Sequence, residues 1–127
     1  MNKYGNKKVV TDDGEIFDSK REAARYMTLT FLERVGAISD LKRQVPFELI
    51  PAQREKSREV YKKGPRKGQP KEGKVIEKAV TYIADFVYID NKTGKKVVED
   101  AKGVRTDVYI IKRKLMLYIH GIKIREE

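Results

Sequence analysis

The stretch that decides the fold reads Thr81-Tyr-Ile-Ala-Asp-Phe-Val-Tyr-Ile-Asp90, then Asn91-Lys-Thr-Gly94, then Lys95-Lys-Val-Val-Glu-Asp-Ala-Lys-Gly103. Its first and last parts are rich in β-branched and aromatic residues, which strands favour. Asn91 and Gly94 are typical of a tight turn, because both tolerate a positive φ. The stretch therefore predicts two antiparallel strands joined by that turn.

The register of this predicted hairpin brings charged residues together. If Asp90 pairs with Lys95, then Asp85 lies opposite Asp100, with Cβ atoms about 4.5–5.5 Å apart on one face. Lys102 follows Asp100 by two residues and projects from the same face. Opposed carboxylates repel each other, and hard divalent cations prefer such oxygen ligands. We expect Asp85 and Asp100 to hold Mg²⁺ or Mn²⁺, although a solvated sheet surface would show the same spacing.

Length, composition and charge bound the class of protein. A chain of 127 residues predicts a single domain over residues 1–127. The lack of cysteine excludes disulfides, thiolate metal sites and a cysteine nucleophile. No apolar run reaches the length of a membrane span and no signal segment is visible, so we expect no membrane association and a cytoplasmic location. The net charge of +10 predicts a polyanionic partner, most simply nucleic acid.

The first half of the chain predicts a small hairpin, a helix and a strand. Apolar pairs flank Asp12-Asp13-Gly14, which is a hairpin signal over residues 9–17. Ser19 and Glu22 fit a capping box at the start of a helix over residues 19–35. An apolar stripe on that helix is predicted to face the core: Ala24, Met27, Phe31 and Val35, widened by Ala23, Tyr26 and Leu32. Residues 38–50 predict a strand, in which Pro46 indicates an edge position or a bulge.

Residues 51–74 differ in composition from the rest of the chain. They combine three glycines and three prolines with a high density of positive charge, so we expect a flexible basic loop or an extended hairpin tip that contacts nucleic acid. A charge run that is merely solvated is the alternative. The candidate nucleic-acid-binding residues are Arg54, Lys56, Arg58, Lys62, Lys63, Arg66, Lys67, Lys71 and Lys74, together with Arg105 further along the chain.

The remaining segments predict one more strand, a second helix and a final strand. Residues 75–89 form a long strand that is expected to bend or split before the central turn. Thr106 and Asp107 begin a helix whose core-facing residues are expected to be Val108, Ile111, Leu115 and Tyr118, and Ile119, Ile122 and Ile124 are expected to form a last strand. Interleaved helices and strands of this kind indicate an α/β fold.

Four segments, taken together and in order, resemble the PD-(D/E)XK nuclease superfamily, and most of all a group of small phage-encoded proteins within it. The quoted segments are Phe17-Asp18-Ser19-Lys20-Arg21-Glu22, Gly36-Ala37-Ile38 with Leu41 to Phe47, Tyr82 to Phe86, and Glu99-Asp100-Ala101-Lys102-Gly103. The superfamily's leading Pro-Asp is absent, since Ala84 precedes Asp85. The resemblance implies a restriction-endonuclease-like αβββαβ core: a mixed central sheet flanked by helices, here with an N-terminal hairpin and a basic loop insertion.

The resemblance also implies roles for individual residues. Asp85 and Asp100 would ligate the metal with help from the Ala101 carbonyl, and Glu22 would complete the site directly or through water. Lys102 would orient the attacking water or stabilise the transition state. Gln44 would lie near the site on the neighbouring strand. Alternation selects Asp100 over Glu99, because only Asp100 shares a face with Lys102.

The implied activity is Mg²⁺- or Mn²⁺-dependent hydrolysis of DNA phosphodiester bonds, by an endonuclease of phage recombination, repair or processing. Branched DNA is one candidate substrate, as for Holliday-junction resolvases and transposon-end endonucleases, and a homodimer is one possible assembly. A phage origin would place the protein in the host cell cytoplasm. Two alternatives remain at this point: a non-catalytic DNA-binding module on the same fold, and an RNA-binding or structural protein whose acidic pair is incidental.

Overall fold

The computed structural model describes residues 8–102 and 104–127, so Gly103 of the quoted motif lies outside the described residues. The chain separates into two compact units, one formed by the segments up to Phe47 and from Ile83 to Glu127, the other by Glu48–Tyr82. The elements of the described residues are β1 (Val9–Val10), β2 (Ile16–Phe17), α1 (Lys20–Arg34), β3 (Ile38–Ile50), β4 (Gln53–Arg54), β5 (Val75–Glu77), β6 (Val80–Asp90), β7 (Lys95–Asp100), α2 (Asp107–His120) and β8 (Arg125–Glu126).

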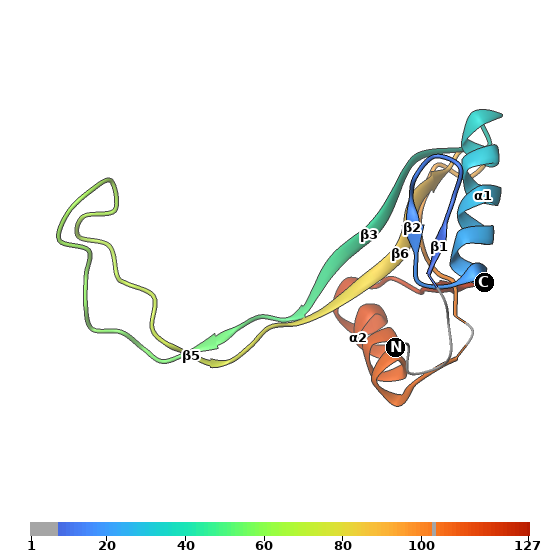
Figure 1. Cartoon of the computed structure of the whole chain (residues 1–127). Coiled ribbons are helices and arrows are strands. Elements are labelled where there is room, and N and C mark those ends of the chain that lie inside the picture. The colour runs from blue at the N-terminus through green and yellow to red at the C-terminus, as the bar shows by residue number, and fades with distance from the viewer. Residues whose placement is uncertain (1–7, 103) are drawn as a thin grey trace. The chain divides into compact units, whose positions relative to one another are not determined.

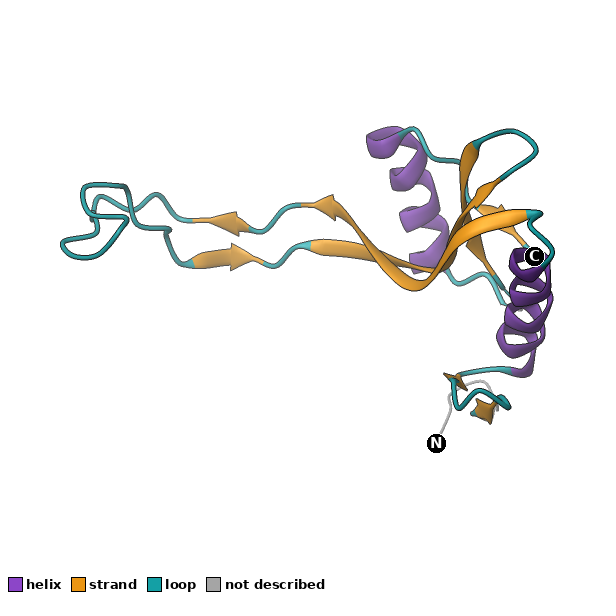
Figure 2. Cartoon of the chain, turned by 90° about the horizontal axis from the view of Figure 1, so that it is seen from above, coloured by secondary structure: helices purple, strands orange, loops and turns teal. Residues whose placement is uncertain are grey.

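The main sheet has four strands in the order β3-β6-β7-β8. β6 and β7 are antiparallel, whereas β7 and β8 are parallel, so the sheet is mixed. β3 is an edge strand, as Pro46 predicts, because an edge can tolerate a missing backbone donor. Figures 1 and 2 show the strands of this sheet running between α1 and α2. The α/β class predicted from the sequence, with a mixed sheet and two helices, is confirmed.

The central hairpin has the predicted register. Asp90 pairs with Lys95, and the ladder continues without a shift to Phe86 opposite Glu99. Gly94 takes a φ of 72°, and its amide donates to the Asp90 carbonyl at 2.7 Å, which closes the turn. Because the ladder is regular, the next step along it sets Asp85 against Asp100, where β6 and β7 end their pairing.

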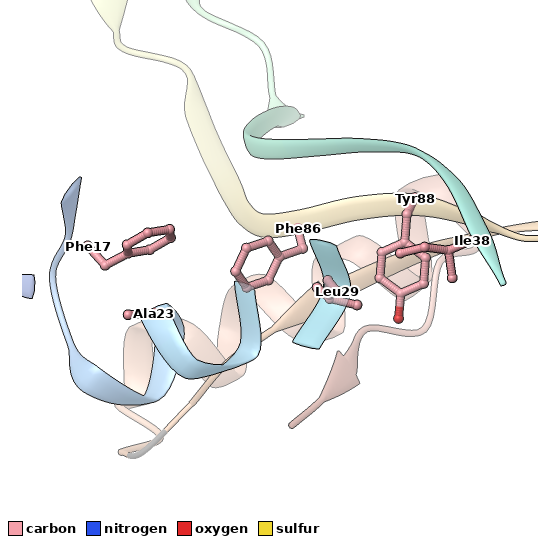
Figure 3. Close-up of a cluster of buried hydrophobic side chains, with 6 residues drawn as sticks. All are labelled: Phe17, Ala23, Leu29, Ile38, Phe86 and Tyr88. Carbon is pink, nitrogen blue, oxygen red and sulfur yellow. The ribbon is translucent and has the colours of Figure 1, made fainter. Parts of the chain in front are cut away.

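α1 and the small β1–β2 hairpin pack on one face of the sheet. Ser19 is the N-cap, and its hydroxyl accepts from the Glu22 amide, which confirms the predicted helix start. The cluster beneath the helix contains the buried residues Phe17, Ala23, Leu29, Ile38, Phe86 and Tyr88 (Figure 3). Phe86 and Tyr88 alternate with Val87 along β6, so one face of this strand serves this cluster and the opposite face carries Asp85 and Val87.

The predicted apolar stripe of α1 is confirmed only in part, because Ala23 is buried and Tyr26 and Leu32 pack against the core while the other predicted positions face outward. Met27, Phe31 and Val35 are 52%, 56% and 59% exposed, whereas Leu29 is fully buried and Glu22 is nearly so. The buried face includes a carboxylate that is paired with polar side chains of β3, and Arg25 on the same helix pairs with buried Glu99. Apolar periodicity alone misassigns such a helix, because charged residues with partners occupy part of its inner face.

The predicted core face of α2 and the predicted last strand were also wrong. Val108, Ile111 and Tyr118 are 62%, 57% and 87% exposed, while Tyr109 and Met116 are buried. The helix begins after Thr106, as expected, but it continues through Ile119 to His120. The final strand is therefore Arg125–Glu126 rather than the segment that begins at Ile119. Its pairing with β7 is set by Glu99 opposite Arg125.

The unit Glu48–Tyr82 is an antiparallel hairpin, drawn from green to yellow in Figure 1. Gln53 pairs with Glu77 and Arg54 with Val75, with a register shift between the two pairs. The predicted long strand over residues 75–89 is split into β5 and β6, as expected for a strand that changes partner. Residues 51–74 were expected to form either a flexible basic loop or an extended hairpin tip, and the structure shows an extended hairpin.

Candidate functional site

Asp85 and Asp100 come together at the end of the β6–β7 ladder. The Asp100 side chain is 1% exposed, and the Asp85 Oδ2 accepts the backbone N–H of Ala101 at 2.9 Å. Burial raises the pKa of Asp85 to about 8, helped by repulsion from Asp100 and Glu22 and by a hydrogen bond to Asp100. The two carboxylates are thus close enough to share a proton, which is the convergence that the hairpin register predicts.

Lys102 lies beside this pair. Its Nζ is 3.4 Å from the Asp100 Oδ1 and 4.7 Å from the centre of the Tyr109 ring. Tyr109 belongs to the first turn of α2, and its hydroxyl donates to the Glu126 Oε2 at 2.9 Å. The ring face therefore holds the ammonium next to the carboxylate through a cation–π contact. Sequence reasoning missed Tyr109, because its position depends on how α2 packs against the sheet.

Glu22 reaches the same neighbourhood from the start of α1. It is buried, its Oε1 accepts from the Gln44 Nε2 at 3.0 Å, and Arg43 Nη2 lies 3.6 Å from the same oxygen. Burial raises the pKa of Glu22, while Arg43 opposes that rise. Glu22 in turn raises the pKa of Asp85. The structure therefore brings the predicted site residues into one region: Glu22, Gln44, Asp85, Asp100 and Lys102.

A local distortion of β3 explains why two successive residues reach Glu22. Gln44 has a φ of 52°, in the left-handed region that non-glycine residues seldom adopt. Successive side chains of a regular strand point to opposite faces, and this conformation interrupts that alternation. Arg43 is also stacked over the Phe17 ring at 3.8 Å and paired with the Glu15 carboxylate at 2.9 Å. No sequence signal marks Arg43, since a positive φ at glutamine cannot be read from composition.

Glu99 has a different role from its neighbour Asp100. Its side chain is fully buried, and its two oxygens accept from the Arg25 Nε and Nη2 at 2.6 and 2.9 Å. The Tyr88 hydroxyl also donates to it, at 2.7 Å. Glu99 is therefore held in the α1-side core by a bidentate ion pair, which agrees with the choice of Asp100 as the site residue.

The oxygen donors of the site suit a hard divalent cation that keeps part of its water shell. Within residues 8–102 and 104–127, no three Asp, Glu or His side chains are arranged to hold a metal ion. Two adjacent carboxylates, with the Ala101 carbonyl next in sequence, suit Mg²⁺ better than a closed cage, because Mg²⁺ keeps several waters and is bound through one or two carboxylates. The two carboxylates also create a negative potential at this position, and a bound cation would neutralise it. Direct ligation by Glu22 stays a prediction.

The candidate nucleic-acid-binding residues divide between the two units. Nine of the ten lie in the Glu48–Tyr82 hairpin, where their stretch was predicted to be basic and extended. Arg105 lies in the other unit, and its Nε is 3.0 Å from the Glu126 Oε2. The carboxylate partner partly neutralises Arg105, so its contribution to polyanion binding is expected to be smaller.

The fold and the site define an α/β protein with a mixed sheet that carries two adjacent carboxylates and a lysine at a strand end. The chain belongs to the DUF1064 family, described as a protein of unknown function, which it matches over residues 1–124. No curated protein and no solved structure matches the chain. In the described part of the chain, neither helix is long and apolar enough to cross a membrane.

Proposed function

We propose that this protein is a Mg²⁺- or Mn²⁺-dependent endodeoxyribonuclease of the PD-(D/E)XK type. The observation that carries the proposal is the contact between the half-buried Asp85 and the buried Asp100, with Lys102 beside it. Holding a half-buried and a buried carboxylate next to each other destabilises the apo protein, as the raised pKa of Asp85 indicates. Carboxylates with such perturbed pKa values are found mainly at functional sites, and a pair of them suits metal-dependent chemistry.

Each side chain has a role that follows from its surroundings. Asp85 and Asp100 would hold the cation, with the Ala101 N–H fixing the Asp85 carboxylate. A bound divalent cation would supply charge neutralisation at the phosphate and activation of water. Lys102, positioned by Asp100 and Tyr109, would place its ammonium where charge develops during hydrolysis. Gln44 and Arg43 would hold the Glu22 carboxylate in a single orientation.

DNA is the proposed substrate because of the charge distribution. The chain carries a net charge of +10, and the hairpin unit contributes ten basic and five acidic residues. A polyphosphate backbone releases counterions when it binds such a surface, which favours association. A non-catalytic DNA-binding module is the second candidate, supported by the same basic hairpin. It differs in predicting DNA binding without cleavage.

A cleavage assay tests the proposal directly. Purified protein is incubated with supercoiled plasmid and with a branched junction, in Mg²⁺, in Mn²⁺ and in EDTA. We expect nicking or cutting that requires the metal and falls by about 10³-fold or more in Asp85→Asn and Asp100→Asn. Glu48→Gln is a matched control, because it removes an exposed carboxylate of the other unit.

Binding of the variants to DNA separates the two candidates. In EDTA, the Asp85→Asn variant should bind DNA as tightly as the wild type, since loss of negative charge does not weaken attraction to phosphate. Metal-dependent cleavage that persists in a purified Asp85→Asn, Asp100→Asn double variant would refute the nuclease assignment. Tight binding with no cleavage in any metal would favour the non-catalytic module.

A further inference from the structure

Beyond β4 and β5 the hairpin unit continues as two antiparallel segments, which Figure 2 draws as loops. Backbone hydrogen bonds continue along it, from the Glu55 amide to the Lys74 carbonyl at 2.8 Å and from the Lys71 amide to the Glu59 carbonyl at 2.9 Å. Val60 and Pro70 form an isolated antiparallel bridge further out. We define the tip as residues 60–70 and the shaft as the paired segments that lead to it.

Charge is segregated between the shaft and the tip. In the shaft, acidic residues alternate with the basic ones, and two of the cations have carboxylate partners, with Arg54 3.8 Å from Glu72 and Lys71 3.7 Å from Glu59. The tip contains no Asp or Glu, and its four cations are exposed: Lys62, Lys63, Arg66 and Lys67. A segment that only needed to be soluble could carry mixed charges, as the shaft does. The segregation therefore indicates a polyanionic partner at the tip.

The tip also has a defined backbone conformation. Gly64 and Gly68 adopt φ values of 83° and 85°, which suit the turns at these positions. The Gly68 amide donates to the Tyr61 carbonyl at 2.8 Å, and the Arg66 guanidinium stacks 4.5 Å from the Tyr61 ring centre. Val60 is 44% exposed, so folding into a core does not account for this order. The cations are thus presented by a shaped ribbon end rather than by a featureless chain.

The shape of this element distinguishes between classes of nucleic acid. The major groove of B-form DNA is about 12 Å wide and admits a two-stranded β-ribbon. The major groove of A-form RNA is deep and narrow, and side chains cannot enter it. Strands in a ribbon lie about 4.8 Å apart, which leaves room for cationic side chains to reach the phosphates on both walls.

We propose that the tip is a major-groove docking element for duplex DNA, with its four cations contacting phosphates. This inference deepens the proposed function, because it names B-form duplex as what the hairpin unit recognises. It does not depend on metal chemistry, since no residue of the tip belongs to the carboxylate site. In this proposal the hairpin unit binds the duplex, and the unit that carries the carboxylate pair hydrolyses it.

Salt-dependent binding of the full chain to a short DNA duplex, measured in EDTA, tests the inference. A variant with all four tip cations replaced by Gln should bind about 10²-fold more weakly, and the slope of log Kobs against log salt should decrease by roughly 3–4. A charge-matched control replaces four exposed lysines of the other unit, Lys92, Lys95, Lys114 and Lys123, by Gln. The control should lose less than about three-fold. Equal losses in the two variants would overturn the inference.

A second variant tests the shape of the ribbon without changing charge. A Cβ at Gly73 would come within 1.6 Å of the Glu55 carbonyl oxygen, so Gly73→Ala must separate the shaft strands. We expect it to weaken duplex binding by about ten-fold, while Gly121→Ala, in the other unit, has little effect on binding. Unchanged binding by Gly73→Ala would contradict a role for ribbon geometry.

Competitors identify the groove and the class of nucleic acid. Methyl green, a major-groove ligand, should compete with the wild type for duplex DNA, whereas the minor-groove ligand netropsin should not. Duplex RNA should bind more weakly than duplex DNA of the same length, because its major groove is closed to the ribbon. Competition by netropsin alone, or RNA binding equal to DNA binding, would overturn the groove assignment even if metal-dependent cleavage is observed. Absence of cleavage with the expected binding would instead reject only the nuclease proposal.

Discussion

The carboxylate pair of the sheet unit and the cationic tip of the hairpin unit place charge in opposite physical situations. Asp100 is 1% exposed and pushes the pKa of Asp85 upward, whereas the tip cations are exposed to water. Like charges held together partly out of water oppose folding, so such a pair is informative even though it involves only two residues. Exposed charges have little effect on stability, so only their segregation from carboxylates is informative. The metal site can therefore be inferred from the contact between two residues, whereas nucleic-acid binding is inferred from the summed charge of the whole tip.

A large effect on stability, which would sharpen this comparison, is expected at Glu99, a buried carboxylate whose two oxygens are both paired. Glu99→Gln leaves the Arg25 guanidinium without its bidentate acceptor, and we expect a loss of roughly 3 kcal/mol in the free energy of unfolding. Urea denaturation measures it. The double variant Arg25→Met, Glu99→Gln should recover part of the loss. Stability equal to wild type in Glu99→Gln would mean that the ion pair is not formed.

The pH dependence of stability should distinguish Asp85 from Glu99. Asp85 has a pKa of about 8 in the folded protein, against an ordinary value of 3.8, so the folded state holds a proton that the unfolded chain releases. The free energy of unfolding should therefore fall as pH rises between about 4 and 8, by several kcal/mol in total from this group, at about 1.4 kcal/mol for each unit of pKa difference.

Asp85→Asn should remove this part of the pH dependence and should be more stable than the wild type at pH 8 in EDTA. Thermal and urea denaturation across pH, with the exposed Asp12→Asn as control, provide the measurement. If the wild type and Asp85→Asn show the same pH profile, the two carboxylates of the site do not interact as described.

Tyr109 is expected to have a smaller effect, on Lys102 alone. Tyr109→Leu removes the ring face beneath the ammonium, and we expect kcat for DNA cleavage to fall about ten-fold with duplex affinity unchanged. Tyr109→Phe keeps the ring, loses the bond to Glu126, and should retain most of the activity. If Tyr109 only stabilised the fold, kcat would fall to a similar extent in both variants. A Tyr109→Phe variant that is as impaired as Tyr109→Leu would contradict a positioning role for the ring.

The smallest effect is expected on the outer faces of the helices. Phe31→Ser and Tyr118→Ser should each change the free energy of unfolding by no more than about 0.5 kcal/mol, because both side chains are more than half exposed. Leu29→Ala is the matched contrast and should cost about 2–4 kcal/mol, since this side chain is fully buried. Strong destabilisation by Phe31→Ser would restore the stripe predicted from the sequence.

The pairing of strand residues was easier to predict from the sequence than the buried faces of the helices. The turn from Asn91 to Gly94 sets the register of β6 and β7, and a register with period two fixes which side chains meet. Asp85 and Asp100 could therefore be brought together from the sequence. Helix α1 instead turns a partly polar face inward, where Glu22 and Arg25 find partners on distant strands. Those partners depend on tertiary packing, as does the positive φ of Gln44 that lets Arg43 and Gln44 reach one carboxylate.

Binding of Mn²⁺ to the apo protein tests most directly whether Asp85 and Asp100 form a cation site. Isothermal titration, with electron paramagnetic resonance of free Mn²⁺ as a second readout, should show about one equivalent bound to the wild type. The Asp85→Asn, Asp100→Asn double variant should lose this binding, while the tip variant should retain it. Equal Mn²⁺ binding by the wild type and the double variant, or no binding by the wild type, would contradict the proposed metal site and with it the nuclease.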